Sequence, residues 1–294
     1  MDSSRQLTVG FIGLGVMGGP MCRNLIRKMP RAEVVVFDRS PEAIEAVAGA
    51  GAAVAASPQD IARRAEIILL SLPNGDAVRQ VVDAMIGGIR PGTIVVDTST
   101  SPVDVTRAMA AQIRAAGGDY LDAPIARTRA AAENGTLSIM VGGDAEAFAR
   151  VLPLLACMGS DVSHCGPVGS GQVVKILNNM VLFQTVHALS EALAIGSRAG
   201  VDAKVLFDIF AKGSADSFAL RNHGQKALLP GDFPPRAFST DYARKDNAYA
   251  IALAAAVGLT PKGAILLDEV FGRAQEQDLG EFYFPVFHKL HSPD

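Results

Sequence analysis

Six residues near the start of the chain, Gly13 to Gly18 (GLGVMG), constrain its fold more than any other segment. The apolar run 7–12 before them predicts a buried strand, and the amphipathic stretch 21–28 after them predicts a helix. A second apolar strand, 33–37, ends at Asp38, twenty residues after the last glycine. This order of strand, glycine turn, helix, strand and acid is typical of dinucleotide binding at a helix N-terminus. A structural turn without a ligand is the alternative.

The residues of this segment have separate expected roles. We expect Gly13 to permit the tight turn, Gly15 to let the backbone approach a pyrophosphate, and Gly18 to let helix and strand pack closely. Asp38 is expected to bond the ribose hydroxyls, which favours NAD, whereas the guanidinium of Arg39 leaves NADP open. Later strand ends face the same edge of the sheet and add further contacts. The candidate cofactor residues are Gly13, Leu14, Gly15, Val16, Met17, Gly18, Asp38, Arg39, Leu72, Pro73, Asn74 and Thr100.

The alternation of strand and helix patterns continues to about residue 167 and predicts a mostly parallel sheet covered on both faces. Beyond residue 168 the strand patterns disappear, and 171–198 reads as one long helix with a possible irregularity at Asn178–Asn179. We therefore expect an α/β fold, with an N-terminal Rossmann domain (1–167) and an all-helical domain (168–294) joined by that helix. The expected strands are 7–12, 33–37, 52–55, 66–72, 93–97, 120–123 and 137–141, and the expected helices are 21–28, 41–50, 58–64, 75–85, 102–115, 171–198, 203–211, 216–227, 242–257 and 261–275.

Composition excludes several classes of function. The chain has 27 basic and 30 acidic residues, so its net charge of −3 offers no basic footprint for nucleic acid or an anionic membrane. Its three cysteines show no paired spacing, which argues against a disulfide framework or a zinc site and suits a reducing compartment. The apolar runs are too short for an export signal or a membrane span. We expect a soluble, cytoplasmic protein that holds no metal.

The segment 169–179 (GSGQVVKILNN) contains a candidate proton-transfer group. A dehydrogenase passes a proton as it passes a hydride, and it needs a titratable side chain near the substrate oxygen. Lys175 and Asn179 are four residues apart and share a helix face. The apolar neighbours of Lys175 predict partial desolvation, which lowers the pKa of its amine. Asn179 can hold the substrate hydroxyl or orient the amine. The alternative is that Lys175 extends outward from a buried helix into solvent.

Four blocks of the sequence carry a resemblance to a known family. They are 10–25 (GFIGLGVMGGPMCRNL), 97–102 (DTSTSP), 122–143 (DAPIARTRAAAENGTLSIMVGG) and 169–179, and Lys245-Asp246 followed by Gly258 and Pro261 is a fifth match. Their order and spacing cover nearly the whole chain. On these motifs the chain resembles the β-hydroxyacid dehydrogenases, which include 3-hydroxyisobutyrate dehydrogenase.

The resemblance implies roles for particular residues. It makes Lys175 the catalytic lysine, Asn179 the asparagine that assists it, and Asn178 a neighbouring substrate contact. It also makes Thr100 a cofactor contact and Lys245 a lysine near the nicotinamide. The family fold is a Rossmann domain and a helical domain joined by a long helix, in dimers or tetramers, with the substrate in the cleft between domains. The implied reaction is NAD-dependent hydride transfer to or from a small anionic β-hydroxy acid or its aldehyde.

One departure from the family pattern bears on the substrate. After Asp-Ala-Pro the family usually has a small residue, then Ser-Gly-Gly, which grips a carboxylate, but this chain has Ala126, Arg127 and Thr128. An arginine binds anions through a charged planar fork rather than through backbone N–H groups. A similar Gly-Arg-Thr occurs in the sulfolactaldehyde reductase branch, where the arginine meets a sulfonate. We expect Ala126, Arg127 and Thr128 to bind a carboxylate or sulfonate, unless Arg127 turns to solvent. In the helical half, His223 could bind an anion, but we expect it to be a helix-surface histidine.

Three other functions compete with this one. Oxidative decarboxylation, as in 6-phosphogluconate dehydrogenase, goes with a much longer helical domain than this chain has. Imine reduction generally goes without a lysine at position 175. A non-catalytic dinucleotide-binding scaffold would be expected to lack Lys175 or its asparagines, and both asparagines are present. The direction of the reaction is not encoded in the residues, because a lysine that donates a proton in reduction accepts one in oxidation.

Overall fold

The computed structural model describes residues 6–235 and 237–291. The chain divides into two compact units, Met1–Lys175 and Ile176–Asp294. The first unit contains the sheet and the second consists of helices, so the predicted combination of a doubly wound α/β domain and an all-helical domain is confirmed. The expected domain boundary at 167/168 stays a prediction.

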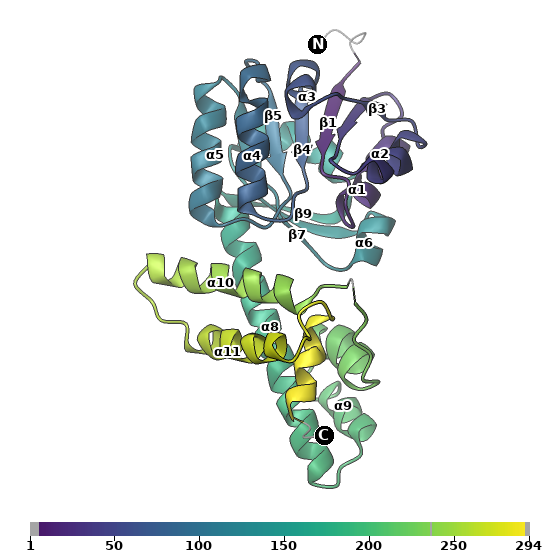
Figure 1. The fold of residues 1–294 in the computed structure, drawn as a ribbon, viewed down its shortest axis with the longest axis vertical. Coiled ribbons are helices and arrows are strands. Elements are labelled where there is room, and N and C mark those ends of the chain that lie inside the picture. The colour runs from purple at the N-terminus through teal and green to yellow at the C-terminus, as the bar shows by residue number, and fades with distance from the viewer. Residues whose placement is uncertain (1–5, 236, 292–294) are drawn as a thin grey trace. The chain divides into compact units, whose positions relative to one another are not determined.

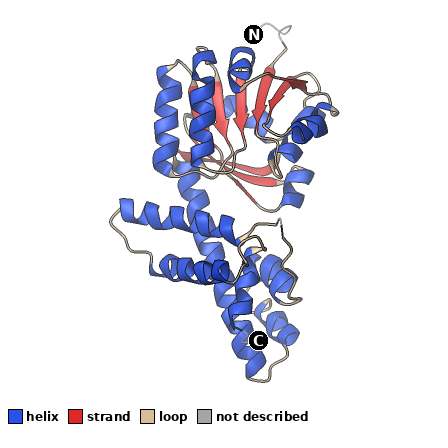
Figure 2. Ribbon diagram, in the orientation of Figure 1, coloured by secondary structure: helices blue, strands red, loops and turns tan. Residues whose placement is uncertain are grey.

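The sheet of the first unit, whose strands are red in Figure 2, has the order β3-β2-β1-β4-β5-β6-β8-β7, with β9 paired to β8. Strands β3 to β6 are parallel, whereas β8 runs antiparallel to β6 and β7. The chain leaves β1 toward β2 on one side and returns to β4 on the other, so the end of β1 is the topological switch point where such sheets bind ligands. The strands are β1 (Thr8–Ile12), β2 (Glu33–Phe37), β3 (Ala53–Val54), β4 (Ile67–Leu70), β5 (Ile94–Asp97), β6 (Asp119–Asp122), β7 (Ile125–Ala126), β8 (Leu137–Gly142) and β9 (Gly159–Gly166).

Both faces of the sheet are buried because successive strand residues point to opposite sides. In β4, Ile67 and Leu69 belong to one hydrophobic cluster, and Ile68 and Leu70 belong to another. This explains why the parallel strands are continuous apolar runs rather than alternating ones. The covering helices are α1 (Gly18–Lys28), α2 (Pro41–Ala48), α3 (Pro58–Arg64), α4 (Gly75–Met85), the 3₁₀ helix η1 (Ile86–Gly88), α5 (Val103–Ala115), α6 (Arg129–Asn134) and α7 (Ala145–Leu155).

The helices of the second unit, from α8 onward in Figure 1, are packed around one hydrophobic cluster that is rich in aromatic residues. Phe183, Phe207, Phe271, Phe284 and Phe287 are fully buried in it. Within the described residues, no helix has both the length and the apolar character that a membrane crossing requires. The helices are α8 (Ser170–Arg198), which begins in the first unit, α9 (Ala203–Phe210), the π-helix η2 (Leu220–Leu228), α10 (Thr240–Ala256), α11 (Lys262–Glu276) and the 3₁₀ helix η3 (Phe284–His291).

The structure differs from the sequence-based expectations in several places. Strands β7 and β9, helices α6 and α7, and the 3₁₀ helices were not predicted, and the antiparallel pairing at β8 was not foreseen. The expected irregularity at Asn178–Asn179 is wrong, because α8 is unbroken there. The helix expected at 216–227 is mostly π-helical and begins later. Strand β9 could not be predicted from the sequence, because it is half exposed and its residues do not alternate between apolar and polar.

Candidate functional site

Two positions in the turn at the end of β1 have room for no residue larger than glycine. Gly13 has a φ of +94°, and a Cβ there would overlap the Ser71 carbonyl oxygen. A Cβ on Gly18 would overlap the Gly13 carbonyl oxygen, so helix α1 can start only with this close contact. Gly15 lies exposed at the tip of the turn, where a Cβ would have no protein atom within 4 Å. The open space above Gly15 fits a pyrophosphate that approaches the backbone.

Helix α1 begins without a side-chain cap from its own N-cap residue. Its N-cap residue, Met17, makes no side-chain hydrogen bond, and its first turn holds no acid. By contrast, α2, α3 and α4 are capped by Ser40, Ser57 and Asn74. The positive end of the helix dipole of α1 suits an anion, although within this first turn the Gly19 N–H already donates to the Gly15 carbonyl oxygen at 3.0 Å and Pro20 has no N–H. The residues present therefore fit the phosphates of a dinucleotide.

The carboxylate of Asp38 fixes the turn from the end of β2. Its Oδ2 accepts a hydrogen bond of 2.6 Å from the Leu14 N–H, and its Oδ1 accepts one of 2.8 Å from the Ser40 N–H. Because each carboxylate oxygen has two lone pairs, both can still accept from ribose hydroxyls. Arg39 is exposed beside it. The candidate ribose site therefore lies next to the candidate phosphate site.

The ends of β4 and β5 meet at the same edge of the sheet. The Leu72 N–H donates to Ser99 Oγ at 2.9 Å, which connects the two strand ends. Asn74 Oδ1 accepts from the Ala77 N–H at 2.9 Å and caps α4, while Thr100 is half-buried between Ser99 and Ser101. The predicted cofactor residues of β1, β2, β4 and β5 are therefore brought to one edge of one sheet.

A buried acid stabilises the loop that follows β5. Asp97 accepts hydrogen bonds from the Ser99 N–H at 2.9 Å and from Tyr120 Oη at 2.9 Å. Desolvation raises the pKa of this carboxyl group to about 6, although the bonds from Ser99 and Tyr120 oppose that rise. The loop 98–101 is therefore anchored by hydrogen bonds among Asp97, Ser99 and Tyr120, which are all buried.

The start of α8 is attached to the end of β6. Asp122 accepts hydrogen bonds from the N–H groups of Gly169 (2.7 Å) and Gln172 (2.8 Å), and it is fully buried. The side chain of Gln172, also fully buried, donates to the Ser99 carbonyl oxygen at 2.8 Å and accepts from the Ser101 N–H at 3.1 Å. The sequence analysis did not single out either residue. Asp122 begins the DAP motif and Gln172 lies three residues before the lysine, so both lie inside the blocks that carried the resemblance.

Lys175 lies in the second turn of α8 and keeps only 9% of its surface exposed. The alternative that it extends into solvent is therefore wrong. Its neighbours in sequence are not uniformly buried, since Val174 and Leu177 are exposed and Ile176 is buried. The burial of Lys175 follows from the helix face it shares with Gln172 rather than from the apolar run around it.

The asparagines and Lys245 belong to the second unit. Asn179 is buried and donates to Asp246 Oδ2 at 2.8 Å, and Asn178 donates to Asn179 Oδ1 at 3.2 Å. Lys245 forms an ion pair with Asp246 Oδ1 at 3.2 Å and packs over the ring of Tyr242. The predicted residues Asn178, Asn179 and Lys245 are therefore joined through Asp246, which the sequence analysis named only as part of a motif.

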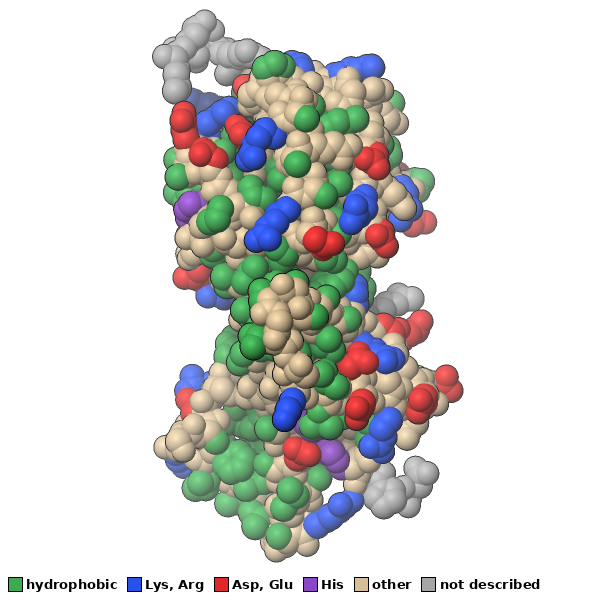
Figure 3. Space-filling model, turned by 90° about the vertical axis from the view of Figure 1, so that its left-hand side faces the viewer, with side chains coloured by type: hydrophobic (Ala, Val, Ile, Leu, Met, Phe, Trp, Pro, Cys, Tyr) green, Lys and Arg blue, Asp and Glu red, His purple; other side chains and the backbone are tan. Residues whose placement is uncertain are grey.

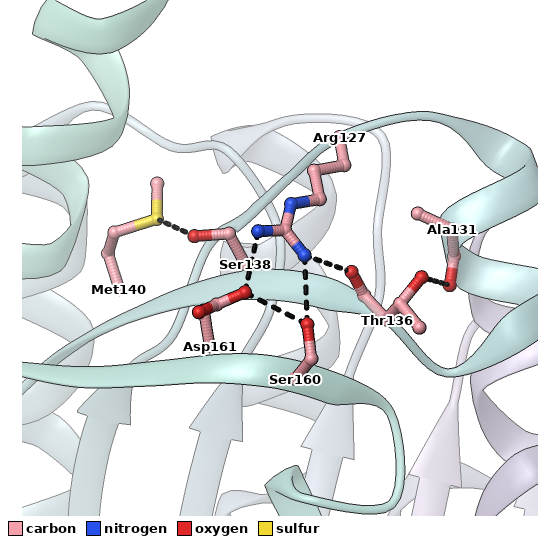
Figure 4. A network of polar contacts seen from close by, with 7 residues as sticks. All are labelled: Arg127, Ala131, Thr136, Ser138, Met140, Ser160 and Asp161. Carbon is pink, nitrogen blue, oxygen red and sulfur yellow. Dashed lines mark hydrogen bonds and ion pairs between the residues drawn. The ribbon is translucent and has the colours of Figure 1, made fainter.

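Arg127 has an unusual backbone and an occupied side chain. Its φ of +87° lies in the left-handed region that favours glycine, which agrees with the family's glycine at this position. Its guanidinium donates to Asp161 Oδ2 at 2.5 Å, to Ser160 Oγ at 2.9 Å and to the Thr136 carbonyl oxygen at 2.6 Å (Figure 4). The Ser160 hydrogen bond and those of Arg127 lower the pKa of Asp161. The side chain therefore folds back onto β9, although 37% of its surface stays exposed to solvent.

The two neighbours of Arg127 are less constrained. Ala126 ends β7, and Thr128 is the N-cap of α6, where its Oγ1 accepts from the Ala131 N–H at 3.4 Å. Both residues are at least partly exposed. The segment 126–128 is thus a surface turn whose shape is fixed by one arginine and one helix cap.

The histidines lie apart from these groups. The sequence favoured a surface position for His223, but it is buried and accepts or donates a hydrogen bond with Tyr283 Oη at 2.5 Å. Desolvation lowers the pKa of this imidazole to about 4. The surface expectation is wrong because the π-helix turns His223 into the aromatic cluster, beside Phe284. In the described part of the chain, no three His, Cys, Asp or Glu side chains are arranged to hold a metal ion.

Comparison with known families places both halves of the chain. Residues 8–166 match the family model described as the NAD binding domain of 6-phosphogluconate dehydrogenase. Residues 169–282 match the model described as the NAD-binding of NADP-dependent 3-hydroxyisobutyrate dehydrogenase. Together the two models account for most of the chain.

Individual proteins of known name are also similar. The 2-(hydroxymethyl)glutarate dehydrogenase of Eubacterium barkeri is 35% identical over 250 residues, covering 84% of this chain and 82% of its own. The NAD-dependent L-serine dehydrogenase of Pseudomonas aeruginosa is 35% identical over 297 aligned positions, covering 97% and 98%. Among solved structures, the 3-hydroxyisobutyrate dehydrogenase of Mycobacterium tuberculosis with L-serine superposes with a TM-score of 0.90 at 31% identity, covering 98% of this chain and all of that one.

Proposed function

The chain belongs to the β-hydroxyacid dehydrogenase family, and from that premise we propose that it transfers a hydride between NAD and the hydroxyl-bearing carbon of a small anionic β-hydroxy acid. The family supports NAD or NADP as the cofactor class. Asp38 supports NAD in particular, because its carboxylate would repel a 2′-phosphate. Exposed Arg39 is the feature that keeps NADP as the second candidate.

One observation carries the proposal. Buried Lys175 lies three residues after Gln172, whose side chain bonds both backbone neighbours of Thr100 at the cofactor edge of the sheet. Residues three apart share a helix face, so the amine and that edge lie on the same side of α8. A titratable amine in a buried position beside a dinucleotide site is the arrangement that alcohol oxidation requires.

The proposed chemistry divides between the cofactor and the chain. When bound, the nicotinamide accepts or supplies the hydride. Lys175 Nζ takes the hydroxyl proton in oxidation and returns it to the carbonyl oxygen in reduction. Asn179, held by Asp246, orients the amine or the substrate hydroxyl, and Asn178 adds a substrate contact. Lys245 contributes positive charge on the nicotinamide side, as the family resemblance implies.

We further propose that Ala126, Arg127 and Thr128 bind the anionic group of the substrate. A carboxylate is favoured over a sulfonate, because the named relatives act on hydroxy acids. L-Serine and 3-hydroxyisobutyrate, each with a carboxylate and a primary hydroxyl, are the first substrates to assay. A scaffold without turnover is not favoured by relatives that are named dehydrogenases.

Substitution of Arg127 tests this substrate proposal. In assays of NAD reduction with a panel of small hydroxy acids, we expect Arg127→Ala to raise KM about tenfold while kcat changes less, since a charge-assisted bond is worth about 1.5–3 kcal/mol. Arg127→Gly is the matched control, because glycine removes the side chain but accepts the φ of +87° without strain. An unchanged KM for every acid in both variants would contradict the contact, and silence of the parent protein across the whole panel would contradict the enzymatic function.

Asp161→Asn separates two ways in which Arg127 can act. If Arg127 contacts the anion, loss of the Asp161 carboxylate frees the Arg127 guanidinium to bind the substrate, and KM falls. If Arg127 only shapes the turn 126–128, its release loosens the turn and raises KM. Arg127 and Asp161 are both exposed. Substitution of either residue is therefore expected to change the free energy of unfolding by less than about 1 kcal/mol.

The helical unit supports the proposal of a homodimer or homotetramer. Val181, Ile195, Val257 and Leu259 are each more than half exposed. Figure 3 shows hydrophobic side chains spread over the face of this unit that is turned toward the viewer. Exposed apolar surface of this kind marks protein interfaces. Sedimentation velocity at micromolar concentration is expected to show a species of two or four chains, and a single monomeric species would contradict this.

We propose the cytoplasm as the location of this activity. All three cysteines, Cys22, Cys157 and Cys165, are free thiols. Free thiols are typical of proteins in a reducing compartment. Desolvation raises the pKa of all three thiols, which lowers the fraction of the nucleophilic thiolate.

A further inference from the structure

We infer that Gln172 is a positioning residue that connects the helical turn of Lys175 to the backbone that flanks Thr100. The inference rests on the proposed function, because it concerns where the amine of Lys175 stands relative to the cofactor edge. It starts from an observation that packing alone does not explain. A glutamine with no exposed surface uses both ends of its amide on backbone groups more than 70 positions away in sequence.

The geometry of the two bonds defines what Gln172 fixes. Its Nε2 donates to the Ser99 carbonyl oxygen at 2.8 Å, and its Oε1 accepts from the Ser101 N–H at 3.1 Å. These groups lie immediately before and after Thr100, so the amide bridges the ends of a three-residue arc. Two hydrogen bonds from one amide fix both the distance between residues 99–101 and α8 and the position of these residues along the helix axis.

The same arc is connected to the rest of the cofactor edge. Ser99 Oγ accepts from the Leu72 N–H, and the Ser99 N–H donates to buried Asp97. A continuous path of hydrogen bonds therefore joins the ends of β4 and β5 to α8 through one side chain. Lys175 follows Gln172 by three residues on the same face of α8. If Gln172 moves relative to residues 99–101, the amine of Lys175 therefore moves with it relative to the edge of the sheet that is proposed to bind the nicotinamide.

Gln172 is not needed to hold α8 on the sheet. Asp122 binds the N–H groups of Gly169 and Gln172, and it would still do so without the glutamine side chain. The glycines of the first turn also pack closely, since a Cβ on Gly142 would lie 2.9 Å from the Gly171 nitrogen. The anchor of the helix and the alignment of its lysine are therefore separate functions, carried by Asp122 and Gln172 respectively.

Gln172→Met tests the alignment, because methionine keeps the length and burial of the side chain and removes both hydrogen bonds. We expect kcat to fall about 10- to 100-fold, as misplacement of a reacting group by a fraction of an ångström does. The KM for the hydroxy acid and the dissociation constant of NAD, measured by binding to the resting protein, are expected to change by less than about threefold.

Thr93→Val is the matched control for lost stability. Thr93 is buried immediately before β5, the strand that leads to Ser99 and Ser101, and its Oγ1 accepts from the Arg90 N–H at 3.3 Å. Each variant removes the hydrogen bonding of a buried polar side chain and is expected to lower Tm, but only Gln172→Met is expected to lower kcat. If kcat falls no further in Gln172→Met than in Thr93→Val, Gln172 has a structural role only and the inference fails.

Gln172→Glu gives a second, independent readout. A protonated glutamic acid can still donate to the Ser99 carbonyl oxygen, whereas the ionised form places negative charge against that oxygen, near Asp122 and Asp97. Burial and these two carboxylates are expected to raise the pKa of the new group. The ratio of its kcat to that of the parent should therefore fall as pH rises, while the ratio for Gln172→Met stays constant. A flat ratio for Gln172→Glu would overturn the inference.

The outcomes separate this inference from the proposed function. If Lys175→Met is inactive and both Gln172 variants keep the parental kcat, only the alignment role fails. If Lys175→Met keeps full activity, the proposed function fails, whatever the Gln172 variants show.

Discussion

Replacement of Lys175 by methionine is expected to lower kcat for hydroxy acid oxidation by about 10²- to 10⁴-fold, which is the range that positioned acid–base groups contribute. Methionine fills the same buried space but can neither take nor return a proton. Because Lys175 is buried, Tm is measured on the same samples, so that a loss of folding is distinguished from a loss of proton transfer. The measurement is steady-state NAD reduction across pH 6–10 together with the dissociation constant of NAD, which should not change.

Lys175→Arg separates proton transfer from simple positive charge. Arginine keeps the charge but does not deprotonate in proteins, and its fork is bulkier than an ammonium group. We expect this variant to be nearly as inactive as Lys175→Met. An arginine variant with more than about a tenth of the parental kcat would show that the residue acts through charge alone, and the acid–base role would have to be given up.

The fold of the first unit was predictable because its strands are buried on both faces. Runs such as 33–37 and 93–97 are apolar without alternation and lie between helix patterns, which is the combination that a parallel sheet requires. Strand β2 has the predicted bounds, and β5 lacks only the first predicted residue. What the pattern could not reveal is the antiparallel end of the sheet. Strands β7 and β9 are short or half exposed, and their pairing with β8 depends on tertiary contacts.

Helix α7 shows a different kind of omission. Its N-cap, Asp144, and its apolar spacing were present in the sequence, but Pro153 lies inside the helix and weakens the pattern. The π-helix over 220–228 carries no local signal that distinguishes it from an α-helix. For this reason, the burial of His223 could not be predicted from its local sequence.

The candidate site was predictable where a role depends on local geometry. The turn 13–18, the acid that ends β2 and the buried lysine of α8 follow from spacing along one or two elements. The partners of these groups did not follow, because they come from distant parts of the chain. Asp161 holds Arg127 from 34 positions away, and Asp246 holds Asn179 from 67 positions away. Arg127 and Asn179 could be identified as candidates from their residue types. Their partners could not, because these depend on the strand order and on helix packing.

Gly15→Ala is expected to raise the dissociation constants of NAD and NADH about 100-fold, equivalent to about 2.7 kcal/mol of binding free energy. The structure separates this loss from any loss of folding. A Cβ at residue 15 meets no protein atom within 4 Å, and the residue does not have a left-handed φ. The Tm of the cofactor-free protein should therefore equal or slightly exceed that of the parent. The new methyl group would instead occupy the space above the turn, where the backbone must approach the pyrophosphate.

Gly18→Ala provides the contrast, because the two glycines differ in what surrounds them. A Cβ on Gly18 would overlap the Gly13 carbonyl oxygen, so this variant is expected to lower Tm by several degrees and to weaken NAD binding only as a consequence. Titration of both variants by NADH fluorescence, with Tm measured on the same samples, distinguishes a cofactor contact from a packing contact. If Gly15→Ala binds NADH as tightly as the parent, the pyrophosphate does not lie over this turn. The cofactor site would then have to be placed elsewhere, even though Asp38 and the uncapped start of α1 point to the same edge of the sheet.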